Sequence, residues 1–152
     1  MFRVSDIIDM PIVSLKSGKR LCTVKSAMID IDTNRLLSLI CKEAIVKKHI
    51  EIIPYKKVIG LSLNEVTVYD EKVFIRLKSN MFRNGHMKFE YVIGRQLYNK
   101  DKEIIGTITD MYFEPLSGRI MALEISEGYI DDLISGRKTI STTDSNLGTY
   151  RQ

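Results

Sequence analysis

Hydrophobic residues in this chain occur in short runs, and polar turn residues interrupt them about every ten positions. Runs of this length and spacing are typical of strands in an all-β barrel or sandwich. The segment Lys72–Lys78 alternates, so Val73, Ile75 and Leu77 would share one face of an extra strand. The other runs of the first half that predict strands are Leu36–Cys41, His49–Tyr55, Lys57–Ser62 and Glu65–Tyr69.

The same pattern occurs twice. Residues 7–15 resemble residues 92–100, a shift of 85, and the shift becomes 84 from Leu21 onward. Leu21–Val24 then matches Ile105–Ile108, and residues 30–39 match residues 114–123. A one-residue difference in the first turn absorbs the change. Self-similarity of this kind predicts two copies of one β unit.

The turns of the two copies also correspond. Polar residues at Lys16–Lys19 and at Lys100–Glu103 separate apolar runs, as a hairpin requires. In the next turn Asn34 aligns with Gly118, and both residue types tolerate a positive φ angle. We therefore expect a left-handed backbone position at both sites. After this turn, residues 36–41 and 120–125 read as equivalent buried strands.

The second copy departs from the first after this strand. Tyr129, Ile130, Leu133 and Ile134 have the spacing of one helical face, and Gly136 suits a helix C-cap. No counterpart exists for the strands between residues 58 and 68. The sequence predicts a complete first barrel over residues 1–78 and a linker over 79–91. A shorter second barrel with a helix would follow over 92–140, with a polar tail over 141–152.

A barrel without its last strands would leave unpaired backbone donors and acceptors, which form a template for strand addition. We expect the shortfall to be met by the strand that carries Val73, Ile75 and Leu77, by a second copy of the chain, or by a partner protein. The first two alternatives make these three residues candidates for a strand-addition or dimer edge.

Charge adds a second candidate surface. The formal net charge is +4, and residues 1–78 hold 14 Lys/Arg against 9 Asp/Glu, whereas residues 79–152 hold 9 against 10. Lys47, Lys48, Lys56 and Lys57 lie near Tyr55, and lysines beside an aromatic ring could contact phosphate and base. A solvated face is the competing interpretation, because acidic residues lie close by and lysine also protects exposed strands from edge pairing.

Other chemistry is not indicated. Cys22 and Cys41 are too few and too far apart in the sequence for a disulfide framework or a zinc site, and each lies in an apolar run typical of a small core residue. The sequence has no metal-ligand cluster, nucleophile motif or phosphate-binding glycine loop, so we expect neither an enzyme nor a cofactor. Without a secretory signal or a long apolar run, the expected location is the cytoplasm.

These residues resemble a known family. The first copy resembles a PRC-barrel domain in Ser5–Val13, Gly18–Leu21 and Ile29–Arg35. The second copy resembles one in Val92–Gly94, Asp110, Glu114, Pro115, Ser117–Arg119 and Glu124, and residues 128–137 resemble the helical segment of bacterial tandem PRC-barrel proteins. The family includes the cytoplasmic domain of the reaction-centre H subunit and the C-terminal barrel of a ribosome-maturation factor.

The resemblance implies a small antiparallel barrel that docks onto other macromolecules and carries no catalytic residues. We therefore expect a tandem PRC-type adaptor that binds another protein or itself. The alternative is a ribosome- or RNA-associated assembly factor that binds through the basic first half. A small-ligand or membrane-surface module is a third possibility for which no specific motif is visible.

Overall fold

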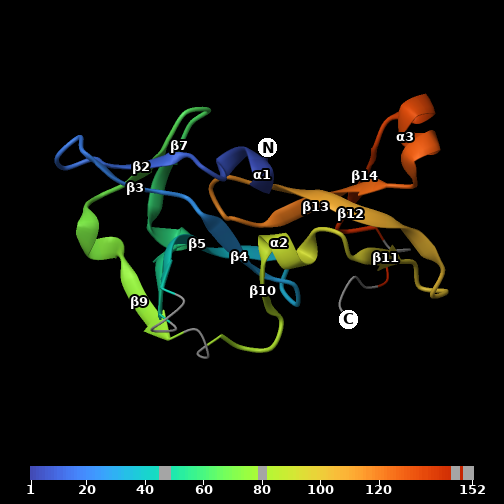
Figure 1. Cartoon of the computed structure of the whole chain (residues 1–152), viewed down its shortest axis with the longest axis horizontal. Helices are drawn as coiled ribbons and strands as arrows, with labels where there is room; N and C mark the ends of the chain where they lie inside the picture. The colour runs from blue at the N-terminus through green and yellow to red at the C-terminus, as the bar shows by residue number, and fades with distance from the viewer. Residues whose placement is uncertain (45–48, 79–81, 145–147, 149–152) are drawn as a thin grey trace.

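The computed structural model describes residues 1–44, 49–78, 82–144 and 148, and these residues form mainly short strands (Figure 1). In the first half the elements are β1 (Phe2–Arg3), α1 (Val4–Ile7), β2 (Pro11–Ser14), β3 (Arg20–Thr23), β4 (Ser26–Asp30), β5 (Arg35–Ala44), β6 (His49–Pro54), the 3-10 turn η1 (Tyr55–Lys57), β7 (Val58–Leu61), β8 (Val66–Val68), the 3-10 turn η2 (Glu71–Val73) and β9 (Ile75–Lys78). In the second half they are β10 (His86–Lys88), α2 (Phe89–Val92), β11 (Gln96–Tyr98), β12 (Ile104–Phe113), β13 (Ile120–Ser126), α3 (Tyr129–Ser135) and β14 (Lys138–Ser141).

The strands form three sheets. Two belong mainly to the first half, with orders β3-β2-β8-β7 and β10-β4-β5-β6-β9, and the third has the order β1-β12-β13-β14 with β11 also paired to β12. Every pairing is antiparallel except that of β2 with β8. The predicted mainly β, antiparallel architecture is confirmed. Among the described residues the hydrogen-bonded strand order does not close into a ring.

The left-handed turn expected in both copies is present. Asn34 has φ 53° and Gly118 has φ 74°. A second pair of equivalent positions, Gly18 at φ 71° and Lys102 at φ 64°, follows the same rule in the first turn. The two repeats therefore have the same backbone conformation at turns where their residue types differ. A turn of this kind requires a positive φ angle, which more than one residue type can adopt.

The first strand of each repeat pairs with the other repeat. In β1, Phe2 lies opposite Phe113 of β12. In β10, Met87 lies opposite Ile29 of β4. The shifts of 85 and 84 carry one pair onto the other, so the two repeats exchange equivalent strands in equivalent register. The segment 86–91, which the sequence assigned to a linker, thus has counterparts in β1 and α1.

The helices that follow these strands, and two hydroxyl–carboxylate hydrogen bonds, show the same exchange between the repeats. Helix α1 contacts β12, and α2 contacts β4. The Ser5 hydroxyl donates to the Asp110 carboxylate, while the Ser26 hydroxyl donates to the Glu90 carboxylate. Ser5 corresponds to Glu90 and Ser26 to Asp110, so hydroxyl and carboxylate have changed places between the repeats. Asp110 is almost completely buried, and a buried carboxylate requires such partners.

The turns at Asn34 and Gly118, which are equivalent in the two repeats, form a junction with pseudo-two-fold symmetry. Arg35 and Arg119, which are equivalent, form an antiparallel bridge. On either side of it, the Leu36 N–H donates to the Gly118 carbonyl at 2.7 Å, and the Ile120 N–H donates to the Asn34 carbonyl at 2.8 Å. These two bonds also exchange under the repeat operation. The turns therefore connect the two sheets as well as ending their own hairpins.

The repeats share one large hydrophobic core, which contains buried residues from both halves. Within this core the ring of Tyr55 meets Phe113 edge to face, with centroids 5.9 Å apart. The Tyr55 hydroxyl donates to the Pro115 carbonyl at 2.6 Å. A smaller cluster on the other side of the β4-β5-β6 sheet contains Met28, Ile40, Ile50 and Ile52.

The structure corrects one expectation about the predicted strand around residues 73–77. Ile75 and Leu77 lie in β9, but Val73 lies in η2, so the three do not share one strand face. Strand β9 pairs with β6 of the first repeat and leaves the second repeat uncompleted. The alternation alone indicated a strand without indicating its partner. Among the described residues β9 ends its sheet, and its role as a dimer edge stays a prediction.

The junction predicts a strong effect of Gly118→Ala. A Cβ atom at this position would lie 2.7 Å from the Tyr55 ring and 3.0 Å from the Leu36 carbonyl oxygen, at a φ of +74°. We expect a loss of about 2 to 4 kcal/mol in the free energy of unfolding, since steric overlap adds to backbone strain. Gly18→Ala is the matched control, with a φ of +71° and open space around it, and should lose only about 1 kcal/mol. Equal losses in urea denaturation would contradict the junction.

The buried Tyr55 predicts a stability change at high pH. Burial, helped by the negative charge of Glu114, raises the pKa of Tyr55 to about 12 from its ordinary value near 10. The fold therefore favours the neutral phenol. The stability that this pKa difference gives the fold is complete below about pH 10. It is lost as the pH rises toward 12, because in that range Tyr55 ionises readily only in the unfolded chain. Between pH 10 and 12 the wild type should lose more stability than Tyr55→Phe; parallel losses would contradict the assignment.

Candidate functional site

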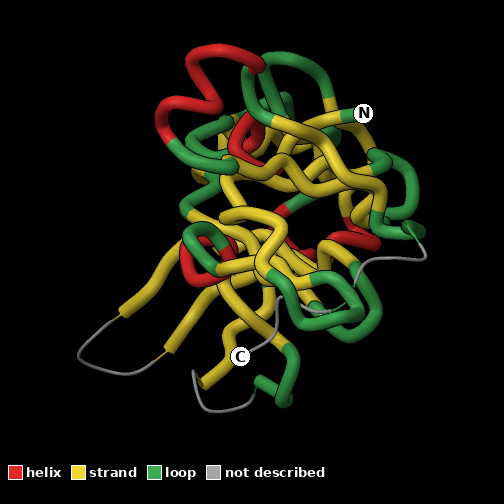
Figure 2. The backbone as a smooth tube through the Cα atoms, turned by 90° about the vertical axis from the view of Figure 1, so that its right-hand side faces the viewer, coloured by secondary structure: helices red, strands yellow, loops and turns green. Residues whose placement is uncertain are grey.

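Helix α3 connects β13 to β14 at the end of their hairpin. Gly136 follows the helix at φ 73°, and its N–H donates to the Asp132 carbonyl at 2.9 Å. The predicted helix with a glycine cap is therefore confirmed over the described residues. Figure 1 and Figure 2 show that α3 projects away from the sheets at the upper end of the molecule.

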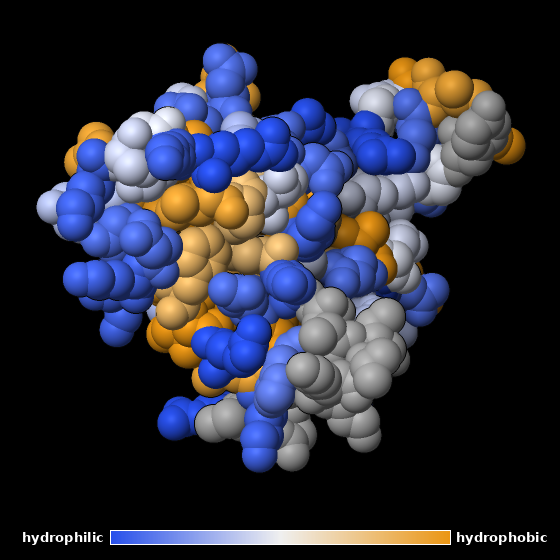
Figure 3. All heavy atoms as spheres, turned by 60° about the vertical axis from the view of Figure 1, so that its left-hand side comes forward, coloured by the Kyte–Doolittle hydropathy of each residue, from blue (hydrophilic) through white to orange (hydrophobic). Residues whose placement is uncertain are grey.

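The apolar face of α3 points to solvent. Ile130, Leu133 and Ile134 are 72, 70 and 78 % exposed. Figure 3 shows a hydrophobic projection at the upper right, the end of the molecule at which Figure 1 places α3. The spacing predicted one helical face, and an apolar face is normally buried against its own domain. Here it is uncovered, and contiguous exposed apolar residues of this kind mark interaction sites.

Polar contacts on the opposite side of α3 hold it in this orientation. The Ser126 hydroxyl donates to Asp132 Oδ2 at 2.6 Å. Arg137 lies 3.9 Å from the same oxygen and 3.5 Å from Glu124 Oε2. Lys138 pairs with Glu127 at 2.9 Å. Within α3 these contacts are made by Asp132, and the apolar residues of the helix lie outside them.

Strand β14 beside this helix has a free outer edge in the described part of the chain. It is equivalent to β6: Ile53 lies opposite Leu39 in the first repeat, and Ile140 lies opposite Leu123 in the second. In the first repeat β9 covers the outer edge of β6, whereas the third sheet ends at β14. We call the free edge of β14 together with Ile130, Leu133 and Ile134 the docking surface.

The lysine candidates do not form a base-stacking site with their aromatic neighbour. Lys56 and Lys57 are exposed on η1. Tyr55 is buried in the shared core at 5 % exposure, so its ring is not accessible to a nucleic-acid base. Lys47 and Lys48 lie outside the described residues. A phosphate contact by Lys56 and Lys57 stays a prediction.

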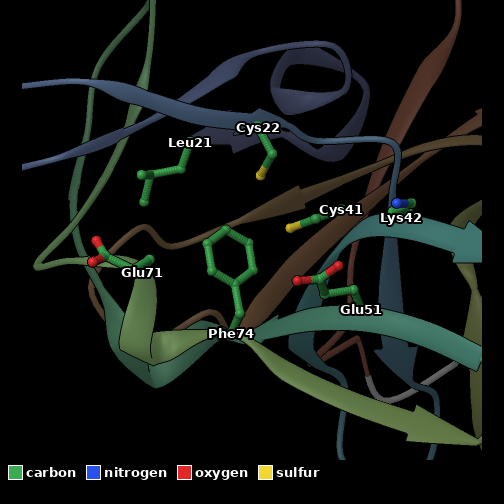
Figure 4. Close-up of a pocket in the computed structure, with 7 residues that line it drawn as sticks. All are labelled: Leu21, Cys22, Cys41, Lys42, Glu51, Glu71 and Phe74. Atoms are coloured by element: carbon green, nitrogen blue, oxygen red, sulfur yellow. The ribbon is translucent and has the colours of Figure 1, made fainter.

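The two cysteines meet in a pocket between two sheets. Cys22 on β3 and Cys41 on β5 line an open pocket of about 360 Å³ together with Leu21 and Phe74, and their thiols point toward each other (Figure 4). Cys41 is buried, as predicted, whereas Cys22 is only half-buried. The distance between the two cysteines along the sequence argued against a disulfide or a zinc site. In the folded chain, however, they lie in the same pocket.

The thiols differ in acidity. Their mutual side-chain interaction is the main cause of a lowered pKa at Cys22. The same interaction, with burial added, raises the pKa of Cys41. The described residues contain no cluster of three or more His, Cys, Asp or Glu side chains that could hold a metal ion. No described helix is long and apolar enough to cross a membrane.

Comparison with known families fits this architecture. The model of the PRC-barrel domain matches residues 1–79 and again residues 85–148. The chain belongs to the PRC-barrel family. The two PRC matches begin close to β1 and β10, the strands that the repeats exchange. A search among curated proteins finds no match to the chain. PRC membership supports the fold and the tandem organisation, and the function must be argued from the surfaces described above.

Proposed function

We propose that the protein is a non-enzymatic adaptor that binds another protein at the docking surface of its second PRC repeat. The observation that supports this most strongly is the exposed apolar face of α3, which a contact of Asp132 orients outward beside an edge of β14 that no described strand covers. Three large apolar side chains contribute a few kcal/mol to binding when a partner removes them from water.

The occupant that we propose is an extended segment of the partner protein. The first repeat provides the template, because β9 pairs antiparallel with β6, with Ile75 opposite Ile52 and Leu77 opposite Ile50. A segment added to β14 in the same way would satisfy the free backbone groups of that edge. Its apolar side chains or a neighbouring element would then cover α3.

This mode of binding should depend little on salt. Charged groups beside the docking surface pair within the chain, as in the Lys138–Glu127 and Arg137–Glu124 pairs. Binding would therefore rest on apolar burial and backbone hydrogen bonds, which salt screens weakly. A second copy of this chain is a competing occupant, and light scattering identifies it as a defined dimer.

The alternative proposal is a ribosome- or RNA-associated factor. It is supported only by the exposed Lys56 and Lys57 and the positive charge of the first half. Binding of this kind weakens steeply as salt rises. Charge reversal at Lys56 and Lys57 would abolish it without affecting α3.

The test compares two sets of exposed apolar residues with one purified partner. The partner is first recovered from lysate at low and high salt, identified, purified and titrated by calorimetry. Ile130→Ser, Leu133→Ser and Ile134→Ser combined should weaken binding by about 100-fold, as expected for loss of a small hot spot. Leu63→Ser, at a residue 84 % exposed in the β7–β8 turn, is the control and should leave the affinity unchanged.

Amide exchange then locates the added strand. In the complex, the amides of Lys138–Ser141 should gain protection, since the new strand would bond to β14. Unchanged binding by the triple serine variant would contradict the docking surface. Salt-sensitive recovery of RNA that disappears with Lys56→Glu and Lys57→Glu would contradict the adaptor proposal and favour the alternative.

A further inference from the structure

The thiol pocket has the geometry of a cross-link site. Cys22 belongs to the sheet β3-β2-β8-β7, and Cys41 belongs to the sheet β10-β4-β5-β6-β9. The two side chains enter the pocket from different strands, and their sulfur atoms point toward each other (Figure 4). Among the described residues no ladder pairing joins β3 to β5, so a bond between the two sulfurs would add a covalent cross-link between the two sheets.

The second repeat contains the equivalent pair of positions. Gly106 corresponds to Cys22, and Ile125 corresponds to Cys41. A Cβ atom built on Gly106 would lie 3.4 Å from the Cβ atom of Ile125. In the second repeat, where these positions lie on the paired strands β12 and β13, their Cβ separation is therefore close to that of a disulfide, which is about 3.5 to 4.5 Å.

A β-bulge directs Cys41 toward its neighbour. The pairing of β5 with β6 shifts between Ile40 and Lys42, so Cys41 is the extra residue of the bulge. Bulges change the direction of a side chain next to functional sites. A second register shift lies in β3 beside Cys22, where the partners of Ile12 and Val13 are Cys22 and Arg20.

The pocket also gives the two thiols different access to solvent. Cys22 is half-buried at the open side, so a small oxidant can reach it. Cys41 is buried, with 6 % of its surface exposed. The lowered pKa of Cys22 increases its thiolate fraction, and the thiolate is the nucleophile.

We propose that Cys22 and Cys41 form a reversible disulfide with hydrogen peroxide as the oxidant, which makes this pocket a redox-sensitive modification site. The assignment does not depend on the adaptor function. In the first step the Cys22 thiolate attacks one peroxide oxygen, the O–O bond breaks, and the departing hydroxide takes a proton to become water. Cys22 is then a sulfenic acid.

In the second step the Cys41 sulfur attacks the Cys22 sulfur. The S–O bond breaks, and the departing hydroxide takes the Cys41 proton to form a second water. The two sulfurs supply the two electrons that reduce the peroxide. A dithiol reductant reverses the reaction through thiol–disulfide exchange.

The bond would join the two sheets of the first repeat and close the loop from residue 22 to residue 41. It would restrict the unfolded chain and should therefore raise Tm. It would also consume both thiols of the pocket. Reduced and oxidised chains should differ in stability with little change in the strand pairings.

The test uses the reduced full-length chain and hydrogen peroxide in slight excess, followed by alkylation and intact-mass measurement. The expected result is a loss of about 2 Da in the wild type, with both thiols protected from alkylation and a Cys22–Cys41 peptide in the digest. Dithiothreitol should restore two alkylatable thiols. Tm should be higher before reduction than after it.

Two variants separate the roles of the thiols. Cys41→Ser should stop at a Cys22 sulfenic acid that dimedone traps, whereas Cys22→Ser should react far more slowly and give no trapped adduct. Three wild-type outcomes would overturn the proposal: two thiols that stay alkylatable, Cys22 oxidised to sulfinic acid without a cross-link, or chains linked to one another. The wild-type measurement decides the question even if a variant fails to fold.

Discussion

The reciprocal exchange of first strands between the two repeats is the constraint on which the rest of the structure depends. β1 completes the sheet of the second repeat, and β10 completes a sheet of the first, in equivalent registers. The helices that follow these strands are exchanged with them. The Ser5–Asp110 and Ser26–Glu90 bonds fix both crossings, and the backbone bonds around Arg35 and Arg119 close the junction. Buried residues of both repeats form one shared core.

This interlocking explains how the repeats can differ so much without loss of the fold. The first repeat carries β7, β8 and β9, whereas the described second repeat carries only β14 and α3 after the shared hairpin. Because the exchanged strands stabilise both halves, the second repeat need not complete its own sheet. Its free edge and the exposed face of α3 follow from that freedom. The asymmetry therefore concentrates the strongest candidate for partner binding in the shorter repeat.

Local features of the fold could be read from the sequence, and pairings between distant segments could not. The left-handed positions at Asn34 and Gly118 and the glycine-capped helix over 129–135 follow from residue types and spacing. The exchange of β1 and β10 could not be read from the sequence, since the hydrophobic pattern of a strand does not indicate which strand it pairs with. For the same reason the alternation around Ile75 predicted a strand but not its place beside β6. The spacing of Cys22 and Cys41 along the chain likewise concealed a shared pocket.

The most direct test of the interlocked core is native-state amide exchange on a chain that lacks residues 1–7, which include β1 and α1. These residues come first in the sequence of the first repeat, yet they pack on β12. Our account predicts that the strongest loss of protection falls on Ile104–Phe113 and Ile120–Ser126 in the second repeat. Loss confined to β2, β3 and β4, with unchanged protection of β12 and β13, would contradict the exchange.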